Sequence, residues 1–183
     1  MNYRQLIREK ALDQFGYVTT GNAREVNVPP VELRKLAQRG ALKNMGYGLY
    51  RLEEAPDGEL DQFAEAVLRG GEGAHLMGDS ILAIYRLGLV APKKIRVGTP
   101  RRVRGKMPKF IEVIKSEIPP DELTTIEGIP STTVAKALLD CQGSIMSERM
   151  TDAITSAWEQ GLITRHEAKE LRTKLRKRMS PAR

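Results

Sequence analysis

Residues 16–52 of the chain, GYVTTGNAREVNVPPVELRKLAQRGALKNMGYGLYRL, carry the pattern that decides the fold. Thr19 and Thr20 offer hydroxyl groups that can cap a short helix running to about Val26. Residues 27–30 then break that helix, because proline lacks an N–H group and biases its predecessor towards extended backbone. A second helix is expected from proline 30 to a glycine stop at Gly40. The stretch therefore predicts two short helices joined by a turn.

Apolar residues recur at helical spacing in the second of these helices. Leu33, Leu36 and Ala37 share one face, which predicts that this face is buried. Arginine and lysine hydrogen-bond guanine edges and phosphates, and glutamine hydrogen-bonds adenine edges. The face left outside has this composition, which is typical of a DNA recognition helix. Its members are Glu32, Arg34, Lys35, Gln38 and Arg39.

A hairpin is expected directly after the second helix, since two short apolar segments, 41–44 and 49–52, flank the glycine-containing loop 45–48. A first helix over residues 2–15 would supply the third helix of the domain. Together these elements predict a winged helix-turn-helix. Any three-helix domain with a hairpin shares the pattern, and a cationic helix face can also be simply solvated, so both interpretations stay open here.

Charge is distributed unevenly along the 183 residues, whose formal net charge is +7 and whose pI is near 9.6. Counting Lys and Arg against Asp and Glu gives net charges of +5, −6, +7 and +1 for residues 1–52, 53–92, 93–120 and 121–183. Basic proteins favour polyanionic partners because they displace counterions from phosphates. Double-stranded DNA is the partner we expect, although acidic protein or membrane surfaces also fit the charge.

The second basic block contains a loop, residues 98–109, that is bounded by glycine and proline. Such a loop is either solvated positive charge or a contact for phosphate or for another partner, and the sequence favours neither interpretation. Its cations are Arg101, Arg102, Arg104, Lys106 and Lys109.

The segment 53–59 combines charge, proline and glycine, as linkers do. We expect a winged helix-turn-helix domain at 1–52, a linker at 53–59, a second domain at 60–179 and a disordered tail at 180–183. In the second domain, helices are expected at 60–69, 79–86, 130–141, 147–160 and 164–179, and strands at 94–97, 110–114 and 123–126. The fold class predicted is α+β, with a small sheet in a mainly helical second domain.

Few residues suit metal, disulfide or nucleophilic chemistry. Cys141 is the one cysteine of the sequence, so an internal disulfide is excluded. His75, Cys141 and His166 do not lie at the spacings typical of metal ligands. We therefore expect no cofactor and no metal, and we place Cys141 in the core because no base is predicted beside it. No run of eighteen apolar residues and no apolar signal core occur, which predicts a cytoplasmic protein.

With these residues in view, the stretch 16–52 resembles the N-terminal winged helix-turn-helix of AbiEi-type antitoxins, from type IV abortive-infection toxin-antitoxin systems of bacteria. Residues 126–140, IEGIPSTTVAKALLD, resemble the second domain of the same family. The matching positions of the first motif are Gly16, Thr19, Thr20, Leu33, Leu36, Gly40, Gly48, Tyr50, Arg51 and Leu52.

The resemblance implies a protein that is not an enzyme and has two roles. Its N-terminal domain would repress its own operon by binding promoter inverted repeats, and its second domain would neutralise a cognate nucleotidyltransferase-type toxin. The resemblance places DNA contact on the exposed positions of the motif. These positions are Thr20, Asn22, Arg24, Arg34, Lys35, Gln38, Arg39, Lys43 and Tyr47.

Two other functions remain open from the sequence. One is a stand-alone winged-helix transcriptional regulator whose second domain senses a ligand. The other is a metal-dependent nucleic-acid-processing enzyme, in which carboxylates of the second domain would hold magnesium. The carboxylates considered for this are Asp79, Glu112, Glu117 and Asp121.

Overall fold

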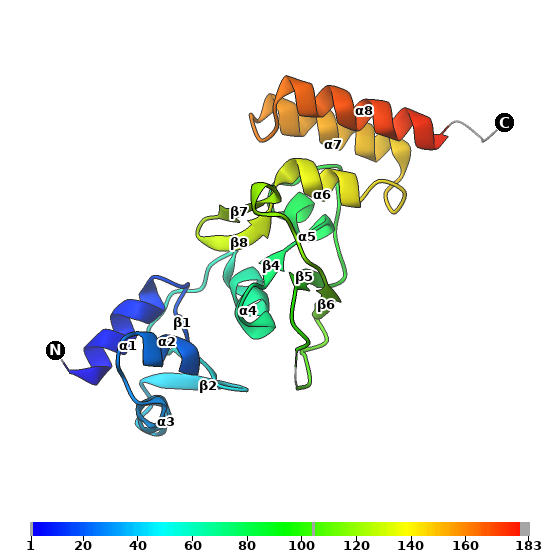
Figure 1. Ribbon diagram of the computed structural model, residues 1–183. Coiled ribbons are helices and arrows are strands. Elements are labelled where there is room, and N and C mark those ends of the chain that lie inside the picture. Colours follow the sequence, from blue (N-terminus) through cyan, green and yellow to red (C-terminus); the bar gives the residue numbers. More distant parts are fainter. Residues whose placement is uncertain (1, 104, 180–183) are drawn as a thin grey trace.

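The computed structural model describes residues 2–103 and 105–179. Arg104 and the predicted tail at 180–183 lie outside the described residues. Within them the chain has the α+β fold predicted from the sequence, with helices and a small sheet first and a larger sheet with further helices after it (Figure 1).

The first part contains the helix-turn-helix and the hairpin. Its elements are α1 (Tyr3–Leu12), β1 (Tyr17–Thr19), α2 (Thr20–Glu25), α3 (Pro30–Gln38), β2 (Leu42–Gly46) and β3 (Leu49–Leu52). We call β2, β3 and the turn between them the wing. The three strands form an antiparallel sheet in the order β1-β3-β2. Strand β1 was not predicted, and it ties the start of α2 to the wing.

Local chemistry sets the ends of these helices. The side chain of Asn2 accepts a hydrogen bond from Gln5 N and caps α1, which ends at Leu12 rather than at residue 15. Phe15 has a φ of 58°, a left-handed conformation that no helix can contain. Helix α3 begins at Pro30, where the missing N–H is not needed. A small core, including Ile7, Val18 and Leu33, joins the elements.

The second part is built around a mixed five-stranded sheet in the order β6-β5-β4-β8-β7. Strands β4 and β8 are parallel, as are β5 and β6, whereas β4–β5 and β7–β8 are antiparallel. The elements are α4 (Asp61–Gly70), β4 (His75–Leu76), α5 (Asp79–Ile84), β5 (Ile95–Thr99), β6 (Ile111–Lys115), η1 (Pro120–Glu122), β7 (Leu123–Ile126), β8 (Ile129–Thr132), α6 (Val134–Asp140), α7 (Ser147–Glu159) and α8 (Arg165–Met179).

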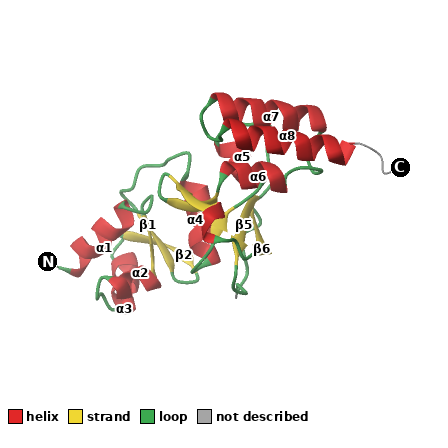
Figure 2. Cartoon of the chain, turned by 45° about the horizontal axis from the view of Figure 1, so that its top comes forward, coloured by secondary structure: helices red, strands yellow, loops and turns green. Residues whose placement is uncertain are grey.

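The layers of this part follow the chain. Helix α6 lies between the sheet and a hairpin formed by α7 and α8, which is the part of the molecule farthest from α1 and α3 (Figures 1 and 2). Thr164 and Glu167 form a capping box at the start of α8, where the Glu167 N–H donates to the Thr164 hydroxyl and the Glu167 carboxylate accepts from Thr164 N.

One helix expected in the second part begins later than predicted. Residues 129–132 form β8 rather than the first turn of a helix, and only Thr133 caps α6. Helix α7 begins at Ser147, as predicted, and its N-cap, Met146, makes no side-chain cap bond. Trp158 lies on the outer surface of α7, 44% exposed.

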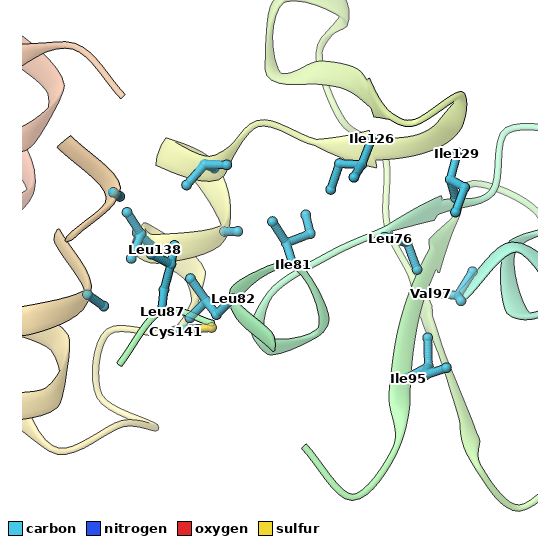
Figure 3. Close-up of a cluster of buried hydrophobic side chains, with 14 of the residues drawn as sticks. Leu76, Ile81, Leu82, Leu87, Ile95, Val97, Ile126, Ile129, Leu138 and Cys141 are labelled. Carbon is cyan, nitrogen blue, oxygen red and sulfur yellow. The ribbon is translucent and has the colours of Figure 1, made fainter. Parts of the chain in front are cut away.

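The large core of the second part reaches into the first. Figure 3 shows its centre, where Leu76 and Val97 of the sheet, Ile81 of α5 and Leu138 of α6 lie with Cys141. Tyr17 of β1 and Leu49 of β3 belong to the same buried cluster. The winged helix is therefore packed against the second part and not only joined to it through residues 53–59.

Candidate nucleic-acid interface

Helix α3 presents a cationic surface. Leu33 and Leu36 are 0% and 7% exposed, so the helix is anchored through the face predicted to be buried. Four polar side chains on the other face, Arg34, Lys35, Gln38 and Arg39, are exposed. Lys35 Nζ donates to Glu32 Oε1 at 2.8 Å along the same helix. Among the described residues, the side chains of Arg34, Gln38 and Arg39 have no hydrogen bond or ion pair, which leaves them available to a partner.

Helix α2 contributes less surface than the sequence implied. Arg24 is exposed, but Asn22 is only 8% exposed. The Asn22 side-chain oxygen accepts from Thr19 N at 2.9 Å and from Gln14 Nε2 at 3.0 Å, while Thr19 Oγ1 accepts from Asn22 N. Asn22 thus completes a capping box, and its buried side chain is turned to the fold rather than to the surface where DNA contact was expected. Half-buried Thr20 donates its N–H to Gly48 O at 2.9 Å and so joins α2 to the wing.

The tip of the wing touches the second part of the chain. Lys43 is exposed on β2, and Tyr47, 73% exposed, stands at the tip with a φ of 51°. Lys106 N donates a 3.3 Å hydrogen bond to the Tyr47 hydroxyl. A Cβ on Gly105 would lie 3.0 Å from Tyr47 Cε1, so the glycine backbone packs directly on the ring. Tyr47, expected to contact DNA, is therefore also a contact within the molecule.

A buried ion pair of α4 holds the wing close to its tip. Arg69 of α4 pairs with Glu65 at 2.8 Å, and the two side chains are 8% and 9% exposed. Arg69 Nη2 also donates to Met45 O of β2 at 2.7 Å. Tyr17 donates its hydroxyl to Glu65 Oε2 at 3.4 Å, and burial, followed by the Glu65 charge, raises the pKa of Tyr17 to about 12.

A second ion pair fixes the far side of the winged helix. Arg51 of β3 donates to Asp61 Oδ2 at 2.9 Å and lies 3.0 Å from Asp57 Oδ1. The i, i+4 spacing of Glu65 and Arg69 was visible in the sequence, but nothing local indicated that Arg69 or Arg51 joins the two parts. These contacts fix the orientation of the wing.

A cleft of about 720 Å³ lies between the winged helix and the second part. Its walls come from the start of α2, the wing tip, the end of α4, residues 105–107 and the turn between β7 and β8. Thr20, Arg69 and Lys106 are among the polar residues that line it.

The basic loop lies beside the wing. Residues 100–110 connect β5 to β6, and we call them the β5–β6 loop. Arg102, Lys106 and Lys109 are exposed, and Arg101 Nη1 lies 2.7 Å from Glu72 Oε2 in a pair whose side chains are both mostly in solvent. Figures 1 and 2 show α3, the wing and this loop along the same side of the molecule.

The carboxylates considered for magnesium are held differently. Asp79 Oδ1 lies 3.5 Å and Glu112 Oε2 3.0 Å from Arg96 Nε, so a guanidinium group sits between them. Burial raises the pKa of Asp79, partly opposed by the Arg96 charge. Glu117 follows β6 and Asp121 is in η1. Across residues 2–103 and 105–179, no three His, Cys, Asp or Glu side chains are grouped as metal ligands would be.

Cys141 and His75 are both buried and contribute to the packing of the fold. Cys141 is fully buried, and burial raises the pKa of its thiol to about 12. His75, 3% exposed, donates from Nδ1 to Gly73 O at 3.0 Å, and its ring lies on Gly98 of the adjacent strand. The thiol is therefore protonated at neutral pH, and the imidazole is packed within the sheet.

The fold defines an α+β protein with an N-terminal winged helix-turn-helix. No protein-family model matches the chain, and no curated protein matches it. Among solved structures, the crystal structure of RV2827C protein from Mycobacterium tuberculosis is similar, with a TM-score of 0.49 and 15% sequence identity over 92% of this chain and 70% of that chain. In the described part of the chain, no helix has the length and apolar character needed to cross a bilayer.

Proposed function

We propose that this chain is a sequence-specific double-stranded DNA-binding protein that represses its own operon at promoter inverted repeats and acts as the antitoxin of a bacterial abortive-infection system. The observation that supports DNA binding most directly is on α3. Arg34, Gln38 and Arg39 are exposed, with no hydrogen-bond or ion-pair partner in the part of the chain that the structure describes, on a helix whose other face is buried.

The chemistry of α3 suits the major groove. The major groove of DNA is about 12 Å wide and admits a helix. In that groove an arginine side chain can form two hydrogen bonds with guanine, and a glutamine side chain can form two with adenine. Lys35 and Arg39 would contact phosphates, and Lys43 of the wing would add a further phosphate contact. One winged helix covers a short half-site, so two copies of the chain are expected on an inverted repeat.

The antitoxin role is supported by the resemblance of residues 16–52 and 126–140 to AbiEi-type antitoxins. The second part, with its own sheet and the helices α6, α7 and α8, offers a surface well away from α3 on which a nucleotidyltransferase-type toxin could be countered (Figure 1). The proposal assigns no catalytic residue to this chain.

DNA recognition is tested by footprinting on the inverted repeats upstream of the gene. The double substitution Arg34→Ala with Gln38→Ala should abolish protection of the repeats while leaving weak, sequence-independent binding. The matched control, Lys174→Ala with Gln62→Ala, removes one exposed cation and one exposed amide elsewhere and should leave the footprint intact. An unchanged footprint for the α3 variant would show that α3 is not the recognition helix.

The antitoxin role is tested by co-expression with the nucleotidyltransferase-like gene expected beside this one. The wild-type chain should restore growth, and the α3 double variant should restore growth while losing repression of a promoter reporter. Failure of the wild-type chain to restore growth would overturn the antitoxin role and leave a regulator.

The 720 Å³ cleft favours the ligand-sensing regulator as the second candidate, because a ligand there would touch both α2 and the second part.

A further inference from the structure

The two basic blocks of the sequence, far apart along the chain, meet at the wing tip. Lys106 N donates to the Tyr47 hydroxyl, and the backbone of Gly105 lies on the Tyr47 ring. Gly105 has a φ of 106°, a backbone conformation open to glycine and strained for other residues. The β5–β6 loop is therefore held against the wing through its backbone, which leaves its cationic side chains exposed.

We propose that the β5–β6 loop is a second DNA-binding element, which contacts the phosphate backbone beyond the wing, and that Tyr47 positions this loop. The inference rests on the proposed function and extends it from the winged helix to a surface shared by both parts of the chain.

The charges of the loop favour a polyanion with regularly spaced negative groups. Arg102, Lys106 and Lys109 are exposed, and among the described residues none of their side chains has an ion pair. Arg101 is paired with Glu72, but with both side chains mostly in solvent that pair adds little stability and can exchange for a phosphate. Three unpaired cations within eight residues repel one another, and this repulsion is relieved when phosphates bind.

The topology of the sheet limits where the cations of the loop lie. Strands β5 and β6 are parallel, with Ile95 opposite Ile111, so the loop must return along the length of β5 before β6 begins. The buried Arg69–Glu65 pair and the Arg69–Met45 bond fix the wing on the same body. Figures 1 and 2 show α3, the wing and the loop along the same side of the molecule, so a duplex that runs along this side from α3 past the wing would reach the loop.

Tyr47 acts as a positioning residue in this arrangement. Its hydroxyl accepts the Lys106 N–H and its ring is packed on Gly105, so the side chain orders the loop from which the phosphate contacts come. Loss of the hydroxyl should weaken binding only through the loop.

The test measures how the affinity for the repeat DNA depends on salt. Each phosphate contact contributes about 0.9 to the slope of log K against log salt concentration. The variant Arg102→Ala with Lys106→Ala and Lys109→Ala should lower that slope by about 2 to 3 while preserving the preference for the repeats over unrelated DNA. The control Lys169→Ala with Lys174→Ala and Lys177→Ala removes the same charge from α8 and should leave the slope close to that of the wild type.

Tyr47→Phe distinguishes positioning from direct contact. It should lower the slope in the wild-type background by part of the loop effect and have no further effect in the triple loop variant. Equal losses in both backgrounds would mean that Tyr47 contacts DNA itself and would overturn its positioning role. Thermal unfolding of each variant checks that the fold is retained.

The outcomes separate this inference from the proposed function. If the wild-type chain does not prefer the repeats, the proposed function fails. If it does, but the triple loop variant has the slope of the α8 control, only the inference fails. A loop variant with an unchanged slope that no longer restores growth with the toxin would place an acidic protein at the loop and overturn the DNA contact.

Discussion

Asn22 shows how a polar residue in a recognition motif can serve the fold. Its side-chain oxygen accepts three hydrogen bonds, from Thr19 N, Thr19 Oγ1 and Gln14 Nε2, at the start of a six-residue helix. Asn22→Ala should lower the free energy of unfolding by about 1–2 kcal/mol, since the half of the capping box that Asn22 supplies is lost and the half-buried donors Thr19 N and Gln14 Nε2 lose this acceptor. Arg24→Ala, on the exposed face of α2, should leave stability within about 0.5 kcal/mol. Both are measured by urea denaturation, and equal stabilities would refute the capping role.

Cys141 is expected to be chemically inert in the native protein. Only the thiolate reacts with alkylating reagents and disulfides, and burial raises the pKa of this thiol from 9.0 to about 12. A thiol-specific reagent at pH 8 should therefore label Cys141 only after denaturation. Labelling of the native chain at a rate near that of the denatured chain would contradict its position in the core.

The same shift predicts how stability depends on alkaline pH. Because the pKa of Cys141 is higher in the folded state than in the unfolded state, its contribution to stability is complete below pH 9 and is lost as the pH rises towards 12. Tyr17, whose pKa is raised from 10.0 to about 12, adds a loss that starts near pH 10. Cys141→Ala should therefore show a shallower decline in melting temperature between pH 9 and 10 than the wild type, and an identical decline would argue against the shift.

At the scale of elements, the contact between β4 and β5 depends on a missing side chain. His75 faces Gly98 across the two strands, and a Cβ on Gly98 would lie 2.4 Å from His75 Nε2. Gly98→Ala should destabilise the protein by about 1–3 kcal/mol through overpacking. In the double variant with His75→Ala, the loss should be smaller than the sum of the two single losses, because the clash is removed.

Gly21→Ala is the matched control for this prediction. Gly21 lies in α2 at a normal φ, and a Cβ there would make an ordinary contact of 3.4 Å with Thr19 Oγ1. Alanine should stabilise the helix by about 0.5–1 kcal/mol. Additive losses for Gly98→Ala and His75→Ala would mean that the two residues do not press on each other.

The elements that could be predicted from the sequence are those with local signals. Helix α3 has its proline start and its Leu33–Leu36 spacing, and α8 has its Thr164 and Glu167 capping box. Strands β1, β4 and β8 have two to four residues each and are defined by partners distant in the chain. The Ser and Thr residues at 131–133 match a helix-capping pattern, which predicts a helix from residue 130. The pairing of β8 with β4 and β7 outweighs that local preference.

Much the same holds for the candidate interface. The exposed cations of α3 could be predicted because helical spacing separates them from buried Leu33 and Leu36. The burial of Asn22 and the contact between Tyr47 and Lys106 could not, because both depend on side chains brought together by the folded chain. The charge of the β5–β6 loop was visible in the sequence, whereas its place beside the wing was not.

At the scale of the whole molecule, Arg69 is one of the residues that join its two parts. Removing it leaves Glu65 buried without its partner and Met45 O without a donor. Arg69→Ala should therefore lower the free energy of unfolding by about 3 kcal/mol. Arg101→Ala breaks an ion pair exposed to solvent and should change stability by less than about 1 kcal/mol. Calorimetry of the two variants gives the comparison, and similar melting temperatures would show that the buried pair does not join the parts.

The contact between Tyr47 and Lys106 also sets the order in which the binding surface is completed during translation. The two residues are 59 positions apart, so the wing tip is made well before the loop that rests on it. At the usual speed of translation, roughly 5–20 residues per second, about 3–12 s separate their synthesis. A nascent chain therefore displays its recognition helix while the neighbouring basic surface is still missing. The full affinity for an operator would be reached only after the loop has been synthesised. Operator binding is therefore expected to favour finished copies of the protein over chains still on the ribosome.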